Sequence, residues 1–171
     1  MTPSPAGHVL RDAVAQDFDA VAKLNLESER FVSPMDRARL EKLHAWASYH
    51  RVVETRGEVA AFLLGFREGA QYDSPNYRWF ARRYPKFFYI DRVVVSEAQR
   101  GQGFAAALYE DAFASAREHG VDTVTCEFDV DPPNPASRRF HAQRGFREVG
   151  MNSYNGKHVA MQALRLDARA D

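Results

Sequence analysis

The sequence predicts an α/β fold in which helices cover both faces of a mixed β-sheet. Segments with strand and helix patterns follow one another in the order β-α-α-β-β-β-α-β-α-β-β, which is typical of a mixed sheet with helices packed on it. The chain has 171 residues, of which 45% are hydrophobic, and this is enough apolar material for one sizeable core. We therefore expect a single domain over residues 8–171, preceded by a Pro-containing disordered tail at residues 1–7.

The first segments alternate between strand and helix patterns. Residues 8–11 predict a short strand, and Asp17 is placed to cap the helix that follows. The apolar positions of that helix recur at near-helical spacing: Phe18, Val21, Leu24 and Leu26. A second helix is expected over 36–48, after Ser33-Pro34 interrupts the chain. Residues 50–55 and 58–66 flank Arg56-Gly57, which is the pattern of a β-hairpin.

The later segments continue the alternation. Residues 69–86 are rich in aromatic side chains and predict an irregular connection. A buried strand over 87–95 precedes a helix over 103–119, and Gly120 stands where a glycine commonly ends a helix. The remaining elements are a strand at 121–130, a helix at 134–143, and strands at 145–149 and 157–166 joined across Tyr154-Asn155-Gly156.

Composition excludes several classes of protein. Lys plus Arg and Asp plus Glu both number 23, so the chain lacks the basic excess of a nucleic-acid-binding protein and we expect no nucleic-acid partner. No apolar run approaches the length of a membrane span, so we expect no membrane association. The single cysteine, Cys126, allows no internal disulfide and fits a reducing, cytoplasmic location.

The most informative stretch is a loop between the strand at 87–95 and the helix at 103–119. It contains Arg100, Gly101, Gln102 and Gly103. Glycines let a backbone approach a phosphate closely, and the free N–H groups and positive dipole end of a helix favour an anion. The spacing lacks Gly-x-Gly-x-x-Gly and has no following Lys-Ser or Lys-Thr, so Rossmann and P-loop sites are excluded. The loop predicts a pyrophosphate-binding cradle, and an ordinary strand-to-helix turn is the alternative.

A second informative segment follows the strand at 121–130. Asn134 is a good N-cap residue, and Pro135 fits the first turn of a helix. Ser137 and His141 are four residues apart and therefore share one helix face, while Phe140 is placed to pack on the sheet.

Together these two segments resemble the GNAT superfamily of acyl-CoA N-acyltransferases, and the long connection before Asp91 resembles an uncharacterised predicted-acetyltransferase subgroup. The resemblance runs from Val9 to about Leu166. Residues 100–105 match the pattern Arg/Gln-x-x-Gly-x-Gly/Ala. Residues 134–146 match Asn-x-x-Ala/Ser-x-x-Phe/Leu-Tyr-x-x-x-Gly-Phe, except that His141 replaces the tyrosine. The resemblance implies a GNAT-like fold with a central, mostly antiparallel sheet.

The resemblance also implies acetyl-CoA as cosubstrate. In the family the first loop binds the pyrophosphate of coenzyme A, and the preceding strand binds the pantetheine through backbone groups. The implied cofactor-binding residues are Val93, Val94, Val95, Arg100, Gly101, Gln102, Gly103, Phe104, Ala105, Asn134, Ser137 and Phe140.

Three side chains are candidates for catalysis. Asp91 lies on the strand that leads into the loop, where many relatives carry a carboxylate. It could act as the base, directly or through water, and a strand-end ion pair with Arg92 or another cation is the alternative. Glu127 shares one strand face with Asp129 and Asp131, so it could attract a cationic amine or hold water, or form part of a solvated row. His141 stands where the family's tyrosine commonly protonates the leaving thiolate, which implies a general acid.

The aromatic segment at 69–86 supplies a candidate acceptor wall. We expect Tyr77, Trp79 and Phe80 to contact the acceptor, and a core extension or a homodimer interface are the alternatives. The remaining histidines are scattered without ligand spacing, so we expect no metal site.

These observations favour an N-acetyltransferase that moves an acetyl group from acetyl-CoA to a primary amine of a small molecule or peptide. A noncatalytic acyl-CoA-binding module is the first alternative. A thioesterase with Cys126 as nucleophile and His141 as its base is the second, although a buried, small apolar role for Cys126 is more common.

Overall fold

The computed structural model describes residues 2–3 and 7–167, which cluster into two compact units. The first unit consists of Met1–Phe66 with Arg92–Ala112, and the second of Arg67–Asp91 with Phe113–Asp171. Of the expected N-terminal tail, residues 1 and 4–6 lie outside the described residues, and β1 (Thr2–Pro3) pairs with the next strand.

Antiparallel strands form the sheet of the first unit. β2 (His8–Asp12) pairs with β3 (Tyr49–Thr55), and β3 pairs with β4 (Glu58–Arg67). The turn between β3 and β4 places Arg56 at φ 53° and Gly57 at φ 78°, the left-handed pair that a two-residue hairpin turn requires. The sequence-based hairpin is therefore confirmed.

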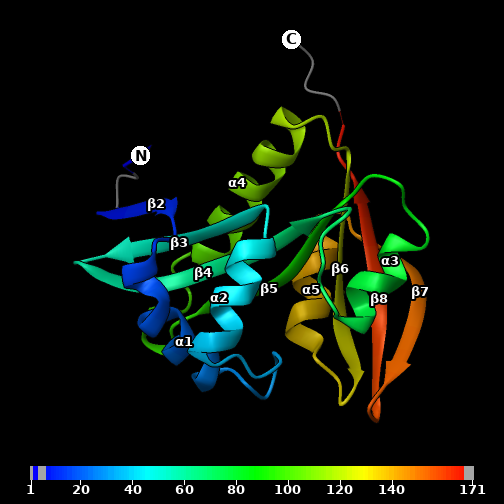
Figure 1. Ribbon diagram of the computed structural model, residues 1–171, viewed down its shortest axis with the longest axis horizontal. Helices are drawn as coiled ribbons and strands as arrows, with labels where there is room; N and C mark the ends of the chain where they lie inside the picture. Colours follow the sequence, from blue (N-terminus) through cyan, green and yellow to red (C-terminus); the bar gives the residue numbers. More distant parts are fainter. Residues whose placement is uncertain (1, 4–6, 168–171) are drawn as a thin grey trace. The chain divides into compact units, whose positions relative to one another are not determined.

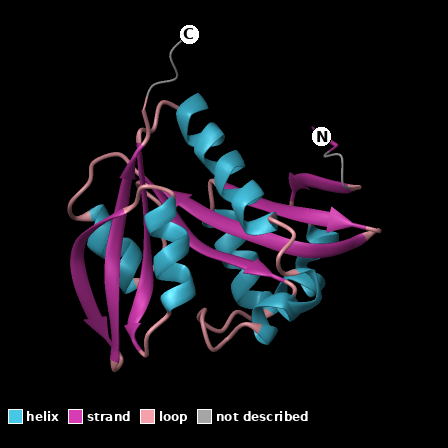
Figure 2. Ribbon diagram, turned by 180° about the vertical axis from the view of Figure 1, so that it is seen from behind, coloured by secondary structure: helices cyan, strands magenta, loops and turns pink. Residues whose placement is uncertain are grey.

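Helices cover both faces of β3, as Figures 1 and 2 show from opposite sides. α1 (Phe18–Glu27) and α2 (Arg37–Trp46) lie on one face, and α4 (Phe104–Glu118) begins on the other. Alternate side chains of β3 follow this division. His50 stacks on Phe18 of α1, whereas the hydroxyl of Tyr49 donates to Asp111 of α4 at 2.7 Å.

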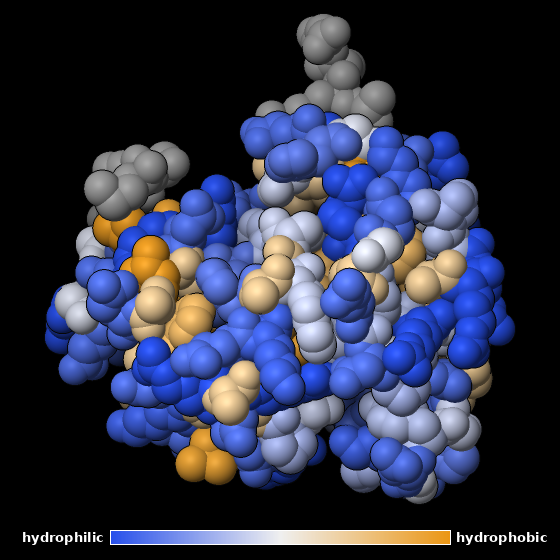
Figure 3. Space-filling view, in the orientation of Figure 1, coloured by the Kyte–Doolittle hydropathy of each residue, from blue (hydrophilic) through white to orange (hydrophobic). Residues whose placement is uncertain are grey.

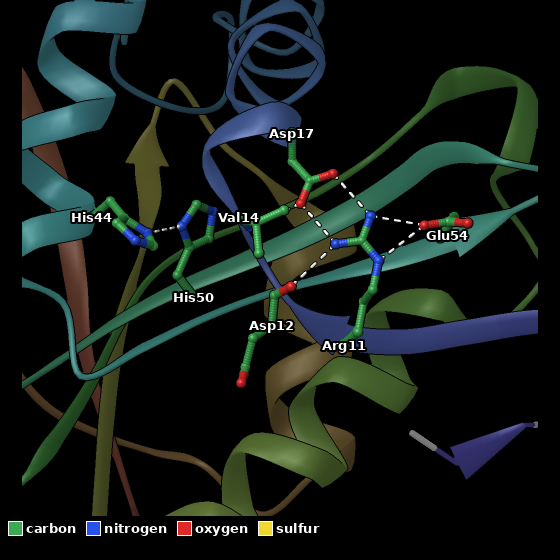
Figure 4. A network of polar contacts seen from close by, with 7 residues as sticks. All are labelled: Arg11, Asp12, Val14, Asp17, His44, His50 and Glu54. Atoms are coloured by element: carbon green, nitrogen blue, oxygen red, sulfur yellow. Dashed lines mark hydrogen bonds and ion pairs between the residues drawn. The ribbon is translucent and has the colours of Figure 1, made fainter.

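A cluster of charged side chains joins β2, β3 and the entrance to α1 (Figure 4). The guanidinium of Arg11 donates to both carboxylate oxygens of Asp17 at 2.7 and 2.9 Å, and to Glu54 at 2.7 Å. Asp17 also accepts from the backbone N–H of Val14, in the short 3-10 turn η1 (Ala15–Asp17). The expectation that the Asp17 side chain caps α1 is wrong, because its oxygens are engaged by Arg11 and Val14.

The sheet of the second unit contains one parallel and two antiparallel pairings. The start of β5 (Phe88–Val95) runs parallel to β6 (Thr123–Asp131). β8 (Lys157–Arg165) is antiparallel to β6, and β7 (Arg147–Tyr154) is antiparallel to β8. The sheet is thus mixed and mostly antiparallel, as expected.

Two helices lie on opposite faces of β6 in the second unit. Residue Glu127 contacts Asn76 of α3 (Pro75–Ala81), while its neighbour Phe128 stacks on His141 of α5 (Pro135–Gln143). The expectation that residues 69–86 are irregular is wrong over α3. Ser74 caps this short helix by accepting from the N–H of Tyr77, and Pro75 begins it.

Exposed apolar side chains are scattered. On the face in Figure 3, hydrophobic residues form small separate groups among hydrophilic ones. Leu26, expected on the buried side of α1, is 66% exposed, because the helix turns Val21 and Leu24 inward instead. In the described part of the chain, no helix is long and apolar enough to cross a membrane.

Candidate functional site

The glycine loop belongs to the first unit, between η2 (Glu97–Gln99) and α4. Arg100, Gly101, Gln102 and Gly103 are all exposed. Both glycines have φ of +80°, which favours glycine over other residues, and a Cβ added to either would meet no atom within 4 Å. The space beside the loop is therefore open, and its residues fit a pyrophosphate group.

The flanking residues hold this loop in place. Phe104, the first residue of α4, is 3% exposed and its ring lies 4.9 Å from the ring of His8. The first N–H groups of an α-helix lack intrahelical partners, so the start of this 15-residue helix offers donors and a positive dipole end to an anion. On β5, Val94 is buried while Val93 and Val95 are half-buried, and Ala105 on α4 is half-buried.

The second predicted segment lies in the other unit, on α5. The side chain of Asn134 accepts from the N–H of Ser137 at 3.2 Å, which confirms the predicted N-cap. Phe140 is half-buried, and the guanidinium of Arg144 lies 3.4 Å from its ring centroid. The cradle residues and the α5 residues are thus grouped separately, each within its own unit.

A buried carboxylate on β6 is the centre of a polar cluster in the second unit. Glu127 Oε1 accepts from the hydroxyl of Tyr89 at 2.8 Å and from the amide of Asn76 at 3.0 Å. Glu127 Oε2 is buried and has no hydrogen-bond partner among the described residues. A buried charge with few hydrogen-bond donors is destabilised, so the protonated form of this carboxyl group is favoured relative to an exposed one.

The pKa of Glu127 is raised to about 8, first by burial and then by the charge of Asp91. The hydrogen bonds from Tyr89 and Asn76 oppose this rise without cancelling it. Burial also raises the pKa of Asp129, and the positive charge of Lys157 acts against that shift. A carboxylate with a pKa near neutrality suits general-base chemistry.

The second candidate carboxylate lies on β5 within the same unit. The hydroxyl of Tyr72 donates to Asp91 Oδ1 at 2.6 Å. Asp91 is half-buried, and its charge contributes to the raised pKa values of Glu127 and Tyr89. Asp131, the last of the expected acidic row, is exposed at the end of β6.

His141 is 5% exposed and surrounded by the rings of Phe128, Phe140 and Phe146. Its Nδ1–H donates to the carbonyl oxygen of Ser137 at 2.7 Å, so the neutral ring carries its proton on Nδ1. Burial lowers the pKa of His141, which favours that neutral form. Its role as general acid stays a prediction.

The three residues expected to contact the acceptor are buried core side chains. Tyr77 is 2% exposed, Trp79 8% and Phe80 0%. The hydroxyl of Tyr77 donates to the carbonyl oxygen of Arg67, and Trp79 lies against Gly150 on β7. Their seating in the core matches the core-extension alternative; the acceptor-wall assignment stays a prediction.

The same segment contains polar residues that the sequence analysis missed. Tyr72 and Asn76 bond to the two candidate carboxylates, and Asn152 on β7 donates to Asn76 at 3.1 Å. A helix pattern over α3, with Ser74 and Pro75 at its start, was the signal that could have placed Asn76 on a fixed element.

Cys126 is 2% exposed on β6, and burial raises the pKa of its thiol well above the ordinary value. The thiolate that a nucleophile requires is therefore disfavoured. Across residues 7–167, no group of three or more histidine, cysteine, aspartate or glutamate side chains is arranged to hold a metal ion.

A mixed sheet with helices on both faces, and a left-handed glycine loop directly before a long helix, define an α/β protein. The model of the Acetyltransferase (GNAT) family matches residues 16–146, and the chain belongs to this family of acetyltransferases. No curated protein matches the chain.

Solved structures of similar fold cover nearly the whole chain. Ard1 from Thermoplasma volcanium is 20% identical, with a TM-score of 0.77 over 95% of this chain and 100% of its own. The ribosomal-protein-S18-alanine N-acetyltransferase from Escherichia coli is 15% identical, with a TM-score of 0.71 over 96% and 97%. The Salmonella typhimurium protein yncA, solved with its cofactor acetyl-CoA, is 19% identical, with a TM-score of 0.69 over 97% and 98%. At these identities the likeness concerns the fold.

Proposed function

We propose that the protein is an N-acetyltransferase that uses acetyl-CoA and acetylates a primary amine of a small molecule or peptide. The observation that carries the proposal is the exposed loop in which Gly101 and Gly103 both adopt φ of +80° directly before α4, in a chain of the acetyltransferase family. The backbone of this loop and the start of α4 would hold the pyrophosphate, with Arg100 as a charged donor. When bound, acetyl-CoA supplies an activated thioester carbonyl.

The second unit supplies the proton-transfer groups in this proposal. Glu127, assisted by the neighbouring charge of Asp91, accepts a proton from the attacking amine. The nitrogen forms the new C–N bond, the C–S bond breaks, and the leaving sulfur receives a proton, a step for which the imidazolium form of His141 is the candidate donor. The anionic surroundings of Glu127, with Asp91 and Asp129, favour an acceptor that arrives as an ammonium ion.

A noncatalytic acyl-CoA-binding module would need the cradle alone. The raised pKa of Glu127 favours an enzyme over such a module. Burying a carboxyl group destabilises the fold, and perturbed pKa values of this kind cluster at catalytic sites. The thioesterase alternative is disfavoured by the raised pKa of Cys126.

The test is steady-state release of free coenzyme A from acetyl-CoA with a panel of primary amines, with mass spectrometry of the acetylated product. We expect release that depends on the amine. Release without any amine, abolished by Cys126→Ala, would support the thioesterase instead. Tight acetyl-CoA binding without turnover of any amine would support the binding module.

A further inference from the structure

Asn76 is a buried amide in the polar cluster around Glu127 on the second unit. It is 3% exposed, and its Nδ2 donates to Glu127 Oε1 at 3.0 Å and to the hydroxyl oxygen of Tyr154 at 3.2 Å. On its other side, Asn76 Oδ1 accepts from Asn152 Nδ2 at 3.1 Å. A carboxamide has its donors on one side and its acceptor on the other. The bond from Asn152 therefore orients the Asn76 amide so that its NH₂ group faces Glu127.

This orientation makes the two oxygens of Glu127 unequal. Oε1 receives two donors, from Asn76 and from Tyr89, whereas Oε2 is buried and has no partner among the described residues. Donors stabilise negative charge on the oxygen that they contact. Oε1 is thus the oxygen held by the protein, and Oε2 is the oxygen left for a mobile proton.

The other groups around Glu127 differ in their effect on its pKa. The titratable side chains that face the cluster from β5, β6, β7 and the segment before α3 are Tyr72, Tyr89, Asp91, Asp129 and Tyr154, with Lys157 of β8 acting on Asp129. Asp91 and Asp129 raise the pKa of Glu127, as burial does, whereas Tyr89 and Asn76 lower it. Of the two donors, only Asn76 is oriented in turn by another side chain amide.

We propose that Asn76, oriented by Asn152, is a positioning residue that holds Glu127 by Oε1 and leaves Oε2 to receive the proton of the acceptor amine. The proposal rests on the proposed function, in which one proton passes from the amine nitrogen to Glu127 and no other bond of Glu127 changes. α3 then serves the reaction through one amide on its buried face.

The test begins with a titration that needs no turnover. Carboxyl carbon-13 NMR of the full-length chain follows Glu127, whose signal is assigned by its loss in Glu127→Gln. In Asn76→Ala we expect the titration midpoint of Glu127 to rise by about one pH unit, because the charged form loses a donor. Asn76→Asp keeps the shape of the side chain and adds a carboxyl group, so the midpoint should rise further.

Asn152→Ala tests the orientation step and touches Glu127 only through Asn76. Without its partner the Asn76 amide is free to turn its Oδ1 toward a protonated Glu127, which also raises the midpoint. Ser153→Ala is the matched control on the same strand, because the hydroxyl of Ser153 contacts exposed His158 instead. The control should leave the midpoint unchanged. An unchanged midpoint in folded Asn76→Asp and Asn152→Ala would overturn the proposal.

Kinetics separate this proposal from the proposed function. With an accepted amine, the acidic limb of the kcat/KM pH profile should move upward by the same amount as the midpoint in Asn76→Ala, while the KM for acetyl-CoA stays constant. Full activity of Glu127→Gln would overturn the positioning role, even if amine acetylation itself is confirmed. A shifted midpoint in a protein that acetylates no amine would support the positioning of Glu127 and contradict the proposed function.

Discussion

The Nδ1 atoms of His44 and His50 lie 2.8 Å apart, so one imidazole donates a hydrogen bond that the other accepts (Figure 4). His50 is 7% exposed, and its Nε2 is buried without a hydrogen-bond partner among the described residues. Burial, and next the charge of His44, lower the pKa of His50 to about 4. A positive charge on both rings would remove the acceptor that this bond requires.

This pair predicts a loss of stability in acid. A histidine with a lowered pKa in the folded state binds protons more readily when unfolded, so the free energy of unfolding falls as the pH drops from about 6.5 to about 4. In His50→Leu the free energy of unfolding should fall less over this pH range, by on the order of 2–3 kcal/mol. Urea denaturation at a series of pH values measures it. The control His158→Leu, at an exposed position, should retain the wild-type slope.

Glu127 predicts the opposite dependence at higher pH. Its raised pKa means that the folded state holds the proton more tightly, so its contribution to stability is lost as the pH rises from about 4.5 to about 8. Gln does not ionise, so Glu127→Gln does not lose stability in this way as the pH rises. Its Tm should exceed that of the wild type by several degrees at about pH 8 and by little at about pH 5. Glu118→Gln, at an exposed site on α4, serves as control, and equal Tm differences at both pH values would contradict the assignment.

The cradle is tested by a side chain at Gly103. Gly103→Val would place atoms in the open space beside the loop and should abolish measurable acetyl-CoA binding in calorimetry. Gly57→Val is a matched control, because Gly57 has φ of +78° and equally open surroundings in the β3–β4 turn. Both variants should lose about 1–3 kcal/mol from backbone strain. Unchanged acetyl-CoA affinity in folded Gly103→Val would refute the cradle.

His141 is tested by turnover. If it protonates the leaving sulfur, His141→Ala should lower kcat by about a hundredfold or more with little change in acetyl-CoA affinity. His141→Tyr should restore part of the rate, because a phenol can also donate a proton. An imidazolium loses its proton as the pH rises, so the rate that depends on it should fall, and burial, which lowers the pKa of His141, moves this fall to lower pH. Equal kcat in wild type and His141→Ala would leave α5 a structural element.

The variant Trp79→Ala distinguishes a role in acceptor binding from a role in core packing. Its indole is 8% exposed and lies under the guanidinium of Arg83, 3.6 Å from the ring centroid. Trp79→Ala should cost about 3–5 kcal/mol of unfolding free energy, as other large truncations in cores do. If Trp79 also contacts the acceptor, the KM for the amine should rise while acetyl-CoA affinity stays constant. An unchanged acceptor profile in this variant, measured below its Tm, would restrict Trp79 to the core.

The sequence predicts correctly those elements that depend on the backbone preferences of their own residues. The Arg56-Gly57 hairpin, the Asn134 cap with Pro135, and Gly120 after α4 at φ of +70° all depend on backbone preferences of one or two residues. These preferences act within a few positions and need no knowledge of the rest of the chain.

Other features depend on partners that are distant in sequence. Asp17 is a residue type that commonly caps helices. Its carboxylate instead accepts two charge-assisted hydrogen bonds from Arg11, which are stronger than a bond from a backbone N–H at the start of α1. The helix α3 is not expected from the sequence, because seven large rings between 69 and 88 suggest irregular covering, whereas a short helix carries three of them, Tyr77, Trp79 and Phe80, and buries all three. The role of Asn76 could not be seen, since its three partners lie about fifty to eighty positions away along the chain.

The contact between Trp79 and Gly150 restricts which residues can occupy positions 79 and 150 in related chains. A Cβ at position 150 would lie 2.5 Å from Cζ2 of the Trp79 ring, so no side chain fits there while the indole is present. In homologous chains we expect the two sites to change together, with glycine beside tryptophan and a larger residue at 150 only where position 79 has become smaller. The order of substitutions is then constrained as well, because the reduction at 79 has to come first in any lineage that keeps a folded intermediate.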